Sequence, residues 1–170
     1  MKTLLYGLLL IPLFLACTSD ISEDNVTPES STSEYLLFGR VGLGWGCSSP
    51  AIYKLQDGKL YADTSGTYCK NRETYTFKGT VLSDAQYQLA KDLSTSFPSD
   101  LSSQASQTFG CPGCADGGMI YIQKKASNGT IKTWLIDDSI LSPYSAGIDN
   151  TFPVYLINYT QKIYTILESL

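Results

Sequence analysis

The chain contains no histidine among its 170 residues. Histidine is the commonest general base near neutral pH and a common metal ligand. Its absence excludes Ser-His-Asp and Cys-His nucleophilic catalysis, and it also excludes zinc sites that use histidine. Chemistry that does not use histidine, such as that of carboxylates and thiols, and binding without catalysis are compatible with this composition.

The chain is also poor in basic residues, with 12 Lys and Arg against 16 Asp and Glu and a formal net charge of −4. Residues 1–16 contain Lys2 and no acid, so the remainder carries a net charge of −5. Such a chain repels phosphate, and nucleic acid is therefore not an expected partner. For the same reason it should not be drawn to anionic lipid headgroups.

The N-terminal apolar run, residues 4–15, is too short to span a bilayer, which takes about 20 apolar residues. It contains Pro12, follows a lysine and ends at the small Ala16, which is the order of a secretory signal peptide. The tetrapeptide Phe-Leu-Ala-Cys at 14–17 resembles the lipobox of bacterial lipoproteins. The resemblance implies cleavage after residue 16 and a lipid on Cys17. The alternative is an uncleaved N-terminal anchor.

Residues 17–33 are rich in Ser, Thr, Asp and Glu and have too few apolar side chains to order themselves. We interpret them as a tether that precedes one domain, residues 34–170. Its acids resemble the export signals of some surface-exposed outer-membrane lipoproteins; the residues concerned are Asp20, Glu23 and Asp24. An ordinary solvated tether explains these acids equally well. The lipid on Cys17 would supply the membrane contact, and the expected location is the outer membrane.

Period-two patterns predict strands over 35–41, 51–55, 59–63 and 73–79, and a second hairpin over 119–125 and 130–137. The dipeptides Asp57-Gly58 and Asn128-Gly129 are strong signals for the two hairpin turns.

Two helices are also predicted. The first begins at Ser83, with Gln86 in capping-box position, and ends before Pro98. The second begins near Thr151 and buries a stripe that includes Leu156 and Ile163. The order β-β-β-β-α-β-β-α predicts an α+β fold, an antiparallel sheet of about five to six strands with two helices packed on one face.

Four cysteines lie in the predicted domain: Cys47, Cys69, Cys111 and Cys114. An even number in an exported chain indicates two disulfides, for which three pairings exist. The turn Cys-Pro-Gly-Cys favours a local Cys111–Cys114 bridge, which leaves Cys47 to pair with Cys69. Two alternatives stay open: a redox-active Cys111–Cys114 dithiol, and a zinc site made of all four cysteines.

Other patterns are weaker. The glycine-rich stretch 42–46 is followed by a predicted strand, where a phosphate-binding loop would need a helix, and Trp45 within it is a candidate interface anchor. Tyrosines could form a sugar-binding face, although they are also good strand formers.

The adjacent Asp137 and Asp138 would point to opposite faces of a strand and so could not act as a glycosidase pair. Asp63, Asp116 and Asp149 lie in or near loops, and no EF-hand spacing occurs.

The tripeptide Asp138-Ser139-Ile140 resembles the O-glycosylation sequon of some Gram-negative lipoproteins, which makes Ser139 a candidate modification site.

Most of residues 35–170 resembles a group of small bacterial lipoproteins without an assigned activity. The most specific part of the resemblance is the run Cys-Pro-x-Cys-Ala-Asp-Gly-Gly at 111–118. It implies no catalytic residue, and the sequence indicates no cofactor and no resident metal. We therefore expect a membrane-anchored binding module with a protein or glycan partner. The alternative is an enzyme, either an extracytoplasmic thiol-disulfide oxidoreductase that uses Cys111 and Cys114 or a carboxylate hydrolase.

Overall fold

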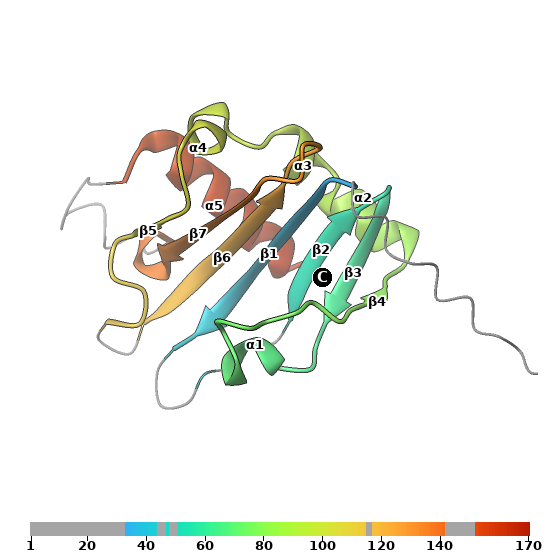
Figure 1. The fold of residues 1–170 in the computed structure, drawn as a ribbon, viewed down its shortest axis with the longest axis horizontal. Helices are drawn as coiled ribbons and strands as arrows, with labels where there is room; N and C mark the ends of the chain where they lie inside the picture. The colour runs from blue at the N-terminus through green and yellow to red at the C-terminus, as the bar shows by residue number, and fades with distance from the viewer. Residues whose placement is uncertain (1–32, 44–46, 48–50, 115–116, 142–151) are drawn as a thin grey trace, which may run out of the picture.

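The computed structural model describes residues 33–43, 47, 51–114, 117–141 and 152–170. Its centre is a seven-stranded sheet with the order β4-β3-β2-β1-β6-β7-β5 (Figure 1). The strands are β1 (Tyr35–Gly42), β2 (Ile52–Gln56), β3 (Lys59–Asp63), β4 (Thr80–Val81), β5 (Gln107–Phe109), β6 (Gly118–Lys125) and β7 (Ile131–Asp137).

The sheet is mixed, because β5 pairs with β7 in parallel while the other neighbours are antiparallel. The predicted α+β class is confirmed, but the purely antiparallel sheet of five to six strands is wrong. Two strands were not predicted, β4 with two residues and β5 with three, and both are too short for a period-two pattern to reveal.

The helices are α1 (Thr67–Lys70), α2 (Asp84–Ala90), α3 (Asp92–Thr95), α4 (Ser99–Ser103) and α5 (Val154–Leu167), with a 3₁₀ turn η2 (Asp138–Leu141). The predicted capping box is present, since the Ser83 side chain accepts from the Gln86 amide and the Gln86 side chain from the Ser83 amide. The predicted single helix is nevertheless divided into α2 and α3. At its end, Thr95 and Ser96 donate their hydroxyls to the Asp92 carbonyl, which competes with regular helix continuation.

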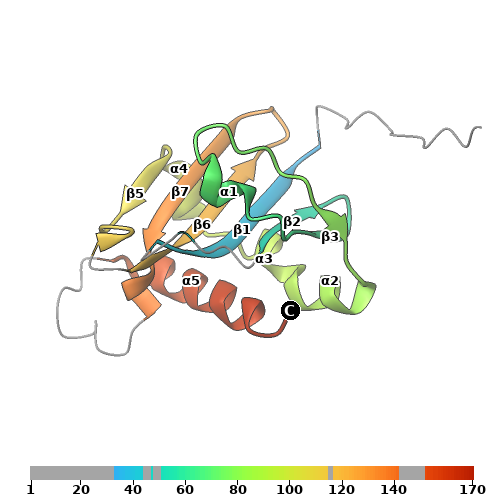
Figure 2. The same cartoon turned by 90° about the horizontal axis from the view of Figure 1, so that it is seen from below.

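The two faces of the sheet carry separate hydrophobic clusters. Helices α2 and α5 lie against one face and the short α1 against the other (Figure 2). Strand β1 shows the alternation that divides them: Leu36 and Phe38 belong to the cluster under α5, whereas Leu37 and Val41 belong to the cluster under α1. The predicted stripe of α5 is confirmed, because Leu156, Tyr159, Thr160, Ile163 and Ile166 are all buried.

The predicted strand over 73–79 does not form. These residues are irregular, although Tyr75 and Phe77 pack against the cluster under α1 as apolar residues of a strand would. The Lys78 amide donates to the Asp63 carboxylate at 3.0 Å. The Lys78 amide is therefore hydrogen-bonded to a side chain instead of to the backbone of a neighbouring strand.

Among the described residues, no helix combines the length and apolar character needed to cross a membrane.

Candidate functional site

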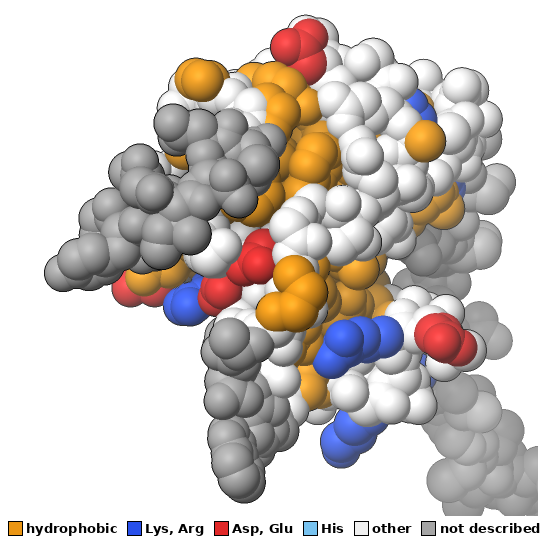
Figure 3. Space-filling model, turned by 90° about the vertical axis from the view of Figure 1, so that its left-hand side faces the viewer, with side chains coloured by type: hydrophobic (Ala, Val, Ile, Leu, Met, Phe, Trp, Pro, Cys, Tyr) orange, Lys and Arg blue, Asp and Glu red, His pale blue; other side chains and the backbone are white. Residues whose placement is uncertain are grey.

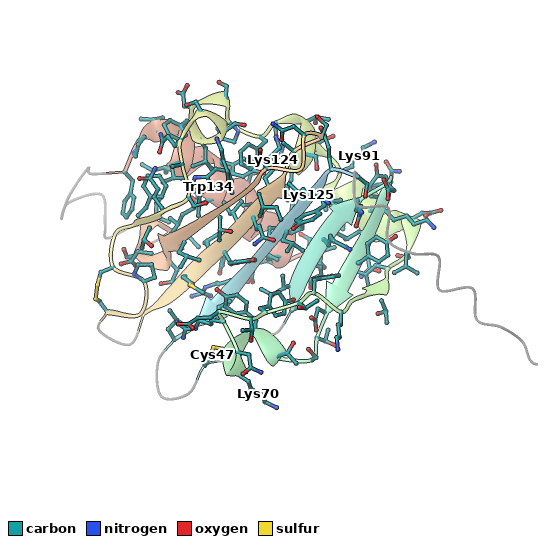
Figure 4. All side chains as sticks on the ribbon, in the orientation of Figure 1. Cys47, Lys70, Lys91, Lys124, Lys125 and Trp134 are labelled. Carbon is teal, nitrogen blue, oxygen red and sulfur yellow. A yellow bond between two sulfur atoms is a disulfide. The ribbon has the colours of Figure 1, made fainter. Side chains whose placement is uncertain are left out.

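A cleft of about 460 Å³ lies at the end of the sheet where β1 begins. Its walls come from β1, the β2–β3 hairpin, the end of β6 and the α2–α3 segment. The basic side chains that line it are Lys91, Lys124 and Lys125. In Figure 4 these three lie toward the same end of the molecule, and Cys47 and Lys70 lie toward the opposite end.

Strand register brings two of the lysines to the cleft. Lys124 and Lys125 end β6, where they pair with Leu36 and Tyr35 of β1. Because successive strand residues point to opposite faces, the two ammonium groups leave on different sides of the sheet end. The Lys124 Nζ lies 4.4 Å from the centre of the Phe97 ring, and the Lys125 Nζ lies 5.9 Å from that of Tyr35.

The third lysine comes from the helical layer. Lys91 is exposed and lies between α2 and α3, and its amide donates to the Tyr87 carbonyl at 2.9 Å. Tyr87, Ser94 and Thr95 line the same wall. The residue that follows the capped helix α2 therefore adds a third ammonium group to the two that β6 carries.

The cleft also contains two carboxylates, Glu34 and Asp57. Glu34 is held by the second hairpin, since its Oε1 accepts from the Ser127 amide at 3.0 Å. Asp57 occupies the first hairpin turn with a φ of 49°. Three ammonium groups against two carboxylates leave the lining with a positive charge, in a chain whose net charge is negative.

A second cleft of about 370 Å³ adjoins the first and shares Glu34 and Lys124 with it. It adds Lys132, whose Nζ donates to the Ser102 carbonyl at 2.6 Å. Trp134 is also part of its lining, yet the indole is buried and donates to the Ala105 carbonyl. The basic surface therefore continues across the end of β6 and β7.

Two of the three aromatic rings that line the main cleft, those of Phe97 and Tyr35, contact other side chains of the protein. One face of Phe97 receives Lys124, and the ring also packs against Trp134 and Tyr159, with centroids 5.5 and 5.2 Å away. Tyr35 receives Lys125 and donates its hydroxyl to Gln123 at 3.0 Å. Stacking of a sugar on these rings would have to displace the ammonium groups, so the lining favours an anionic ligand.

Asp63 is buried, with 4 % of its surface exposed, and it is fully occupied by hydrogen bonds. Its Oδ1 accepts from the amide and hydroxyl of Ser65, and its Oδ2 accepts from the Tyr75 hydroxyl and the Lys78 amide. Burial alone would raise the pKa of this carboxyl, but the hydrogen bonds from Ser65, Lys78 and Tyr75 together outweigh it and hold the pKa below its usual value. Asp63 therefore organises residues 64–78 and is not a free catalytic acid.

The pKa of Tyr75 is shifted in the opposite direction from that of Asp63. Burial and the hydrogen bond to the Asp63 carboxylate raise the pKa of Tyr75 above its usual value. Its ring packs edge-on to Tyr68, 5.1 Å between centroids, and burial raises the pKa of Tyr68 to about 12. Both tyrosines are thus neutral hydrogen-bonding and packing groups at physiological pH.

The adjacent Asp137 and Asp138 both hold the cysteine-containing loop, so neither is available as a catalytic acid. Asp137 Oδ2 accepts from the Cys111 amide at 3.0 Å, and Asp138 Oδ1 accepts from the Gly118 amide at 2.9 Å. Asp138 also forms an ion pair with Arg40 at 2.9 Å. Together the two carboxylates join both ends of the 111–118 run to the end of β7.

Disulfides join Cys47 to Cys69 and Cys111 to Cys114, with Cα–Cα distances of 5.3 and 5.5 Å. These are the pairs that the sequence favours. Cys111 and Cys114 are exposed and follow β5 in a turn, whereas reactive dithiols of the thioredoxin type lie at a helix N-terminus. In the described part of the chain, no group of three or more Cys, Asp or Glu could hold a metal ion.

The remaining predicted site residues are placed only in part. Ser139, the candidate modification site, is exposed in η2, and its amide donates to Asp137 at 2.9 Å. Outside the described residues lie Cys17, Trp45, Asp116 and Asp149. Of the three aspartates that lie in or near loops in the sequence, Asp63 alone is described, and its carboxylate is fully hydrogen-bonded.

Figure 3 views the molecule from the β5 side and shows a band of hydrophobic side chains. Lysine and arginine side chains on this face lie away from the upper part of the band. This surface therefore differs in character from the lysine-lined cleft.

Sequence reasoning missed the cleft. Its residues come from positions 34–36, 55–58, 87–97 and 124–125, and only the crossing of α2–α3 over the sheet end brings them together. The one available signal is the Lys124-Lys125 pair at the end of a predicted strand, which by itself is typical of a solvated strand end.

Comparison with protein-family models, with curated proteins and with solved structures finds no significant match to this chain.

Proposed function

We propose that this chain is a lipid-anchored, extracytoplasmic binding module whose lysine-lined cleft receives an acidic segment of a partner protein. The observation that carries the proposal is the position of Lys91, Lys124 and Lys125 around one cleft, supplied by a helix end and a strand end. The lipobox-like sequence before Cys17 supports the anchor and the compartment.

An acidic peptide suits the lining better than a neutral sugar does. Ammonium groups bind carboxylates through charge-assisted hydrogen bonds, and the rings of Phe97 and Tyr35 already receive lysines. Because both the cleft and such a ligand are exposed to solvent, we expect a moderate affinity that falls as salt rises.

The test is the binding of a fluorescent hexaglutamate probe to the full chain in detergent, followed by fluorescence anisotropy. The variant Lys91→Gln/Lys124→Gln/Lys125→Gln should bind about tenfold more weakly or worse, a loss of roughly 1.4 kcal/mol or more. The matched control, Lys70→Gln/Arg72→Gln/Lys78→Gln, removes the same charge at exposed residues outside the cleft lining. It should bind like the wild type.

Equal weakening by both triple variants would contradict the proposal, because it would show that only the net charge matters. Tighter binding of a tetragalacturonate probe than of hexaglutamate would replace the acidic peptide with an acidic glycan.

A further inference from the structure

The negative charge of the chain is concentrated in one segment. Residues 17–33 carry four acids and no basic residue, namely Asp20, Glu23, Asp24 and Glu29. Residues 34–170 contain eleven basic and twelve acidic residues, so the domain is close to neutral. Any basic surface of the domain therefore has an acidic counterpart within the same chain.

The acidic segment joins the domain at the cleft. Ser33, the first described residue, accepts a hydrogen bond from Gln56 through its hydroxyl, and Gln56 lines the cleft. The next residue, Glu34, lines both this cleft and the one beside it. The chain therefore leaves the domain at the rim of the lysine-lined cleft.

The chain between Ser33 and the four acids is long enough for their carboxylates to reach the cleft. A chain covers at most about 3.5 Å per residue, so Glu29 lies within about 14 Å of Ser33 and Asp20 within about 45 Å. A ligand linked to its site in this way binds intramolecularly, at an effective concentration that reaches the millimolar range for short linkers. Even weak ion pairs would then be substantially occupied.

We propose that the acidic segment 20–29 of this chain docks in the cleft, pairing its carboxylates with Lys91, Lys124 and Lys125. This inference rests on the proposed function, because it assigns an internal occupant to the same cleft. An acidic partner then binds by displacing the segment, and the segment sets the threshold affinity that a partner must exceed.

Zero-length carbodiimide coupling of the full chain in detergent tests the contact, because it joins only carboxylates and amines that touch. After protease digestion, mass spectrometry should find amide links from residues 20–29 to Lys91, Lys124 or Lys125. Such links should be at least fivefold more abundant than links to Lys70 and Lys78, which do not line the cleft. Links spread evenly over all five lysines would overturn the inference.

A second measurement uses the variant Asp20→Asn/Glu23→Gln/Asp24→Asn/Glu29→Gln, which leaves the domain unchanged. Removing the competing carboxylates should tighten hexaglutamate binding several-fold at low salt, and the gain should shrink as salt screens the charges. Unchanged affinity would overturn the inference.

The two proposals fail separately. If hexaglutamate binds the cleft while the segment neither couples to it nor competes, the internal contact is wrong and the binding function stands. If the segment couples selectively but hexaglutamate does not bind even the neutralised variant, the internal contact stands and the binding of an acidic partner is wrong.

Discussion

At the scale of single residues, Asp63 is central to the face of the sheet that α1 covers. Its carboxylate receives two backbone amides, from Ser65 and Lys78, and two hydroxyls, from Ser65 and Tyr75. Hydroxyl groups can reverse their role toward a new neighbour, but backbone amides cannot. The residue therefore tolerates no replacement that donates hydrogen bonds.

The substitution Asp63→Asn should destabilise the fold by about 2 kcal/mol, because one amide donor faces the new NH₂ group and stays unpaired. Urea denaturation followed by circular dichroism measures the change. Asp57→Asn is the matched control, since Asp57 is an exposed turn residue with positive φ, where Asn is equally suitable. The control should change stability by less than about 0.5 kcal/mol. A loss of the same size in both variants would contradict the role given to Asp63.

Asp63 also makes the free energy of unfolding depend on pH. Its pKa is lowered in the folded state, so its stabilising contribution is complete above the pKa of the unfolded chain, about 3.9, and is lost as pH falls through the folded-state pKa. The stability difference between wild type and Asp63→Asn should therefore be constant near neutrality and shrink below about pH 4. Urea titrations at several pH values measure it, and a difference that grows in acid would have the wrong sign.

At the scale of elements, the two disulfides constrain very different lengths of chain. The Cys47–Cys69 bridge spans a sequence separation of 22, and the Cys111–Cys114 bridge one of 3. Loop entropy makes the first worth about 3 kcal/mol and the second about 2 kcal/mol or less. The first also adjoins Tyr68, a buried member of the cluster under α1.

Cys47→Ser/Cys69→Ser should therefore lower the unfolding free energy more than Cys111→Ser/Cys114→Ser does, as measured by guanidinium denaturation. The reverse order would indicate that the short bridge has a larger structural role than loop length allows.

The exposed position of Cys111 and Cys114 also permits a direct check of thiol chemistry. Insulin reduction by the full chain should not exceed that of a Cys111→Ser control, because the pair lies in a turn beside the Asp137 carboxylate and, among the described residues, no α-helix begins at either cysteine. Turnover that depends on Cys111 would replace the structural interpretation with a redox one.

Local signals predicted the elements that depend on local chemistry. Asp57 and Gly58 both have positive φ in the predicted hairpin turn, and the capping box at Ser83 is present. The pattern over 73–79 wrongly predicted a strand, because Tyr75 and Phe77 pack as strand residues do. The backbone next to them is instead fixed by the hydrogen bond from the Lys78 amide to the Asp63 side chain. The parallel strand β5 was missed because its partner β7 lies more than twenty residues away, with no local pattern to mark the pairing.

At the scale of the whole molecule, the candidate site depends on topology. Lys91 and Lys124 are separated by more than thirty residues and belong to different layers, so no spacing rule could have joined them. The same topology places Ser33, where the predicted tether enters, beside Gln56 at the cleft. The segment that we propose as tether therefore joins the domain beside the basic cleft.

This arrangement predicts a characteristic response to salt. Raising NaCl from about 0.02 to 0.3 M shortens the screening length from roughly 20 to 6 Å, so hexaglutamate should dissociate from the tether-neutralised variant. Anisotropy titrations at several salt concentrations measure the slope. Binding independent of salt would point to apolar contacts instead of the lysines.

The most direct test of the central claim is an NMR titration of the ¹⁵N-labelled full chain in detergent with hexaglutamate, using the tether-neutralised variant so that the cleft is open. The account predicts that amide shifts concentrate at Lys91, Thr95 and Lys124, and that Lys70 and Lys78 are unaffected. Shifts centred on Lys70 and Lys78, or no localised shifts at saturating probe, would contradict the assignment of this cleft as the binding site.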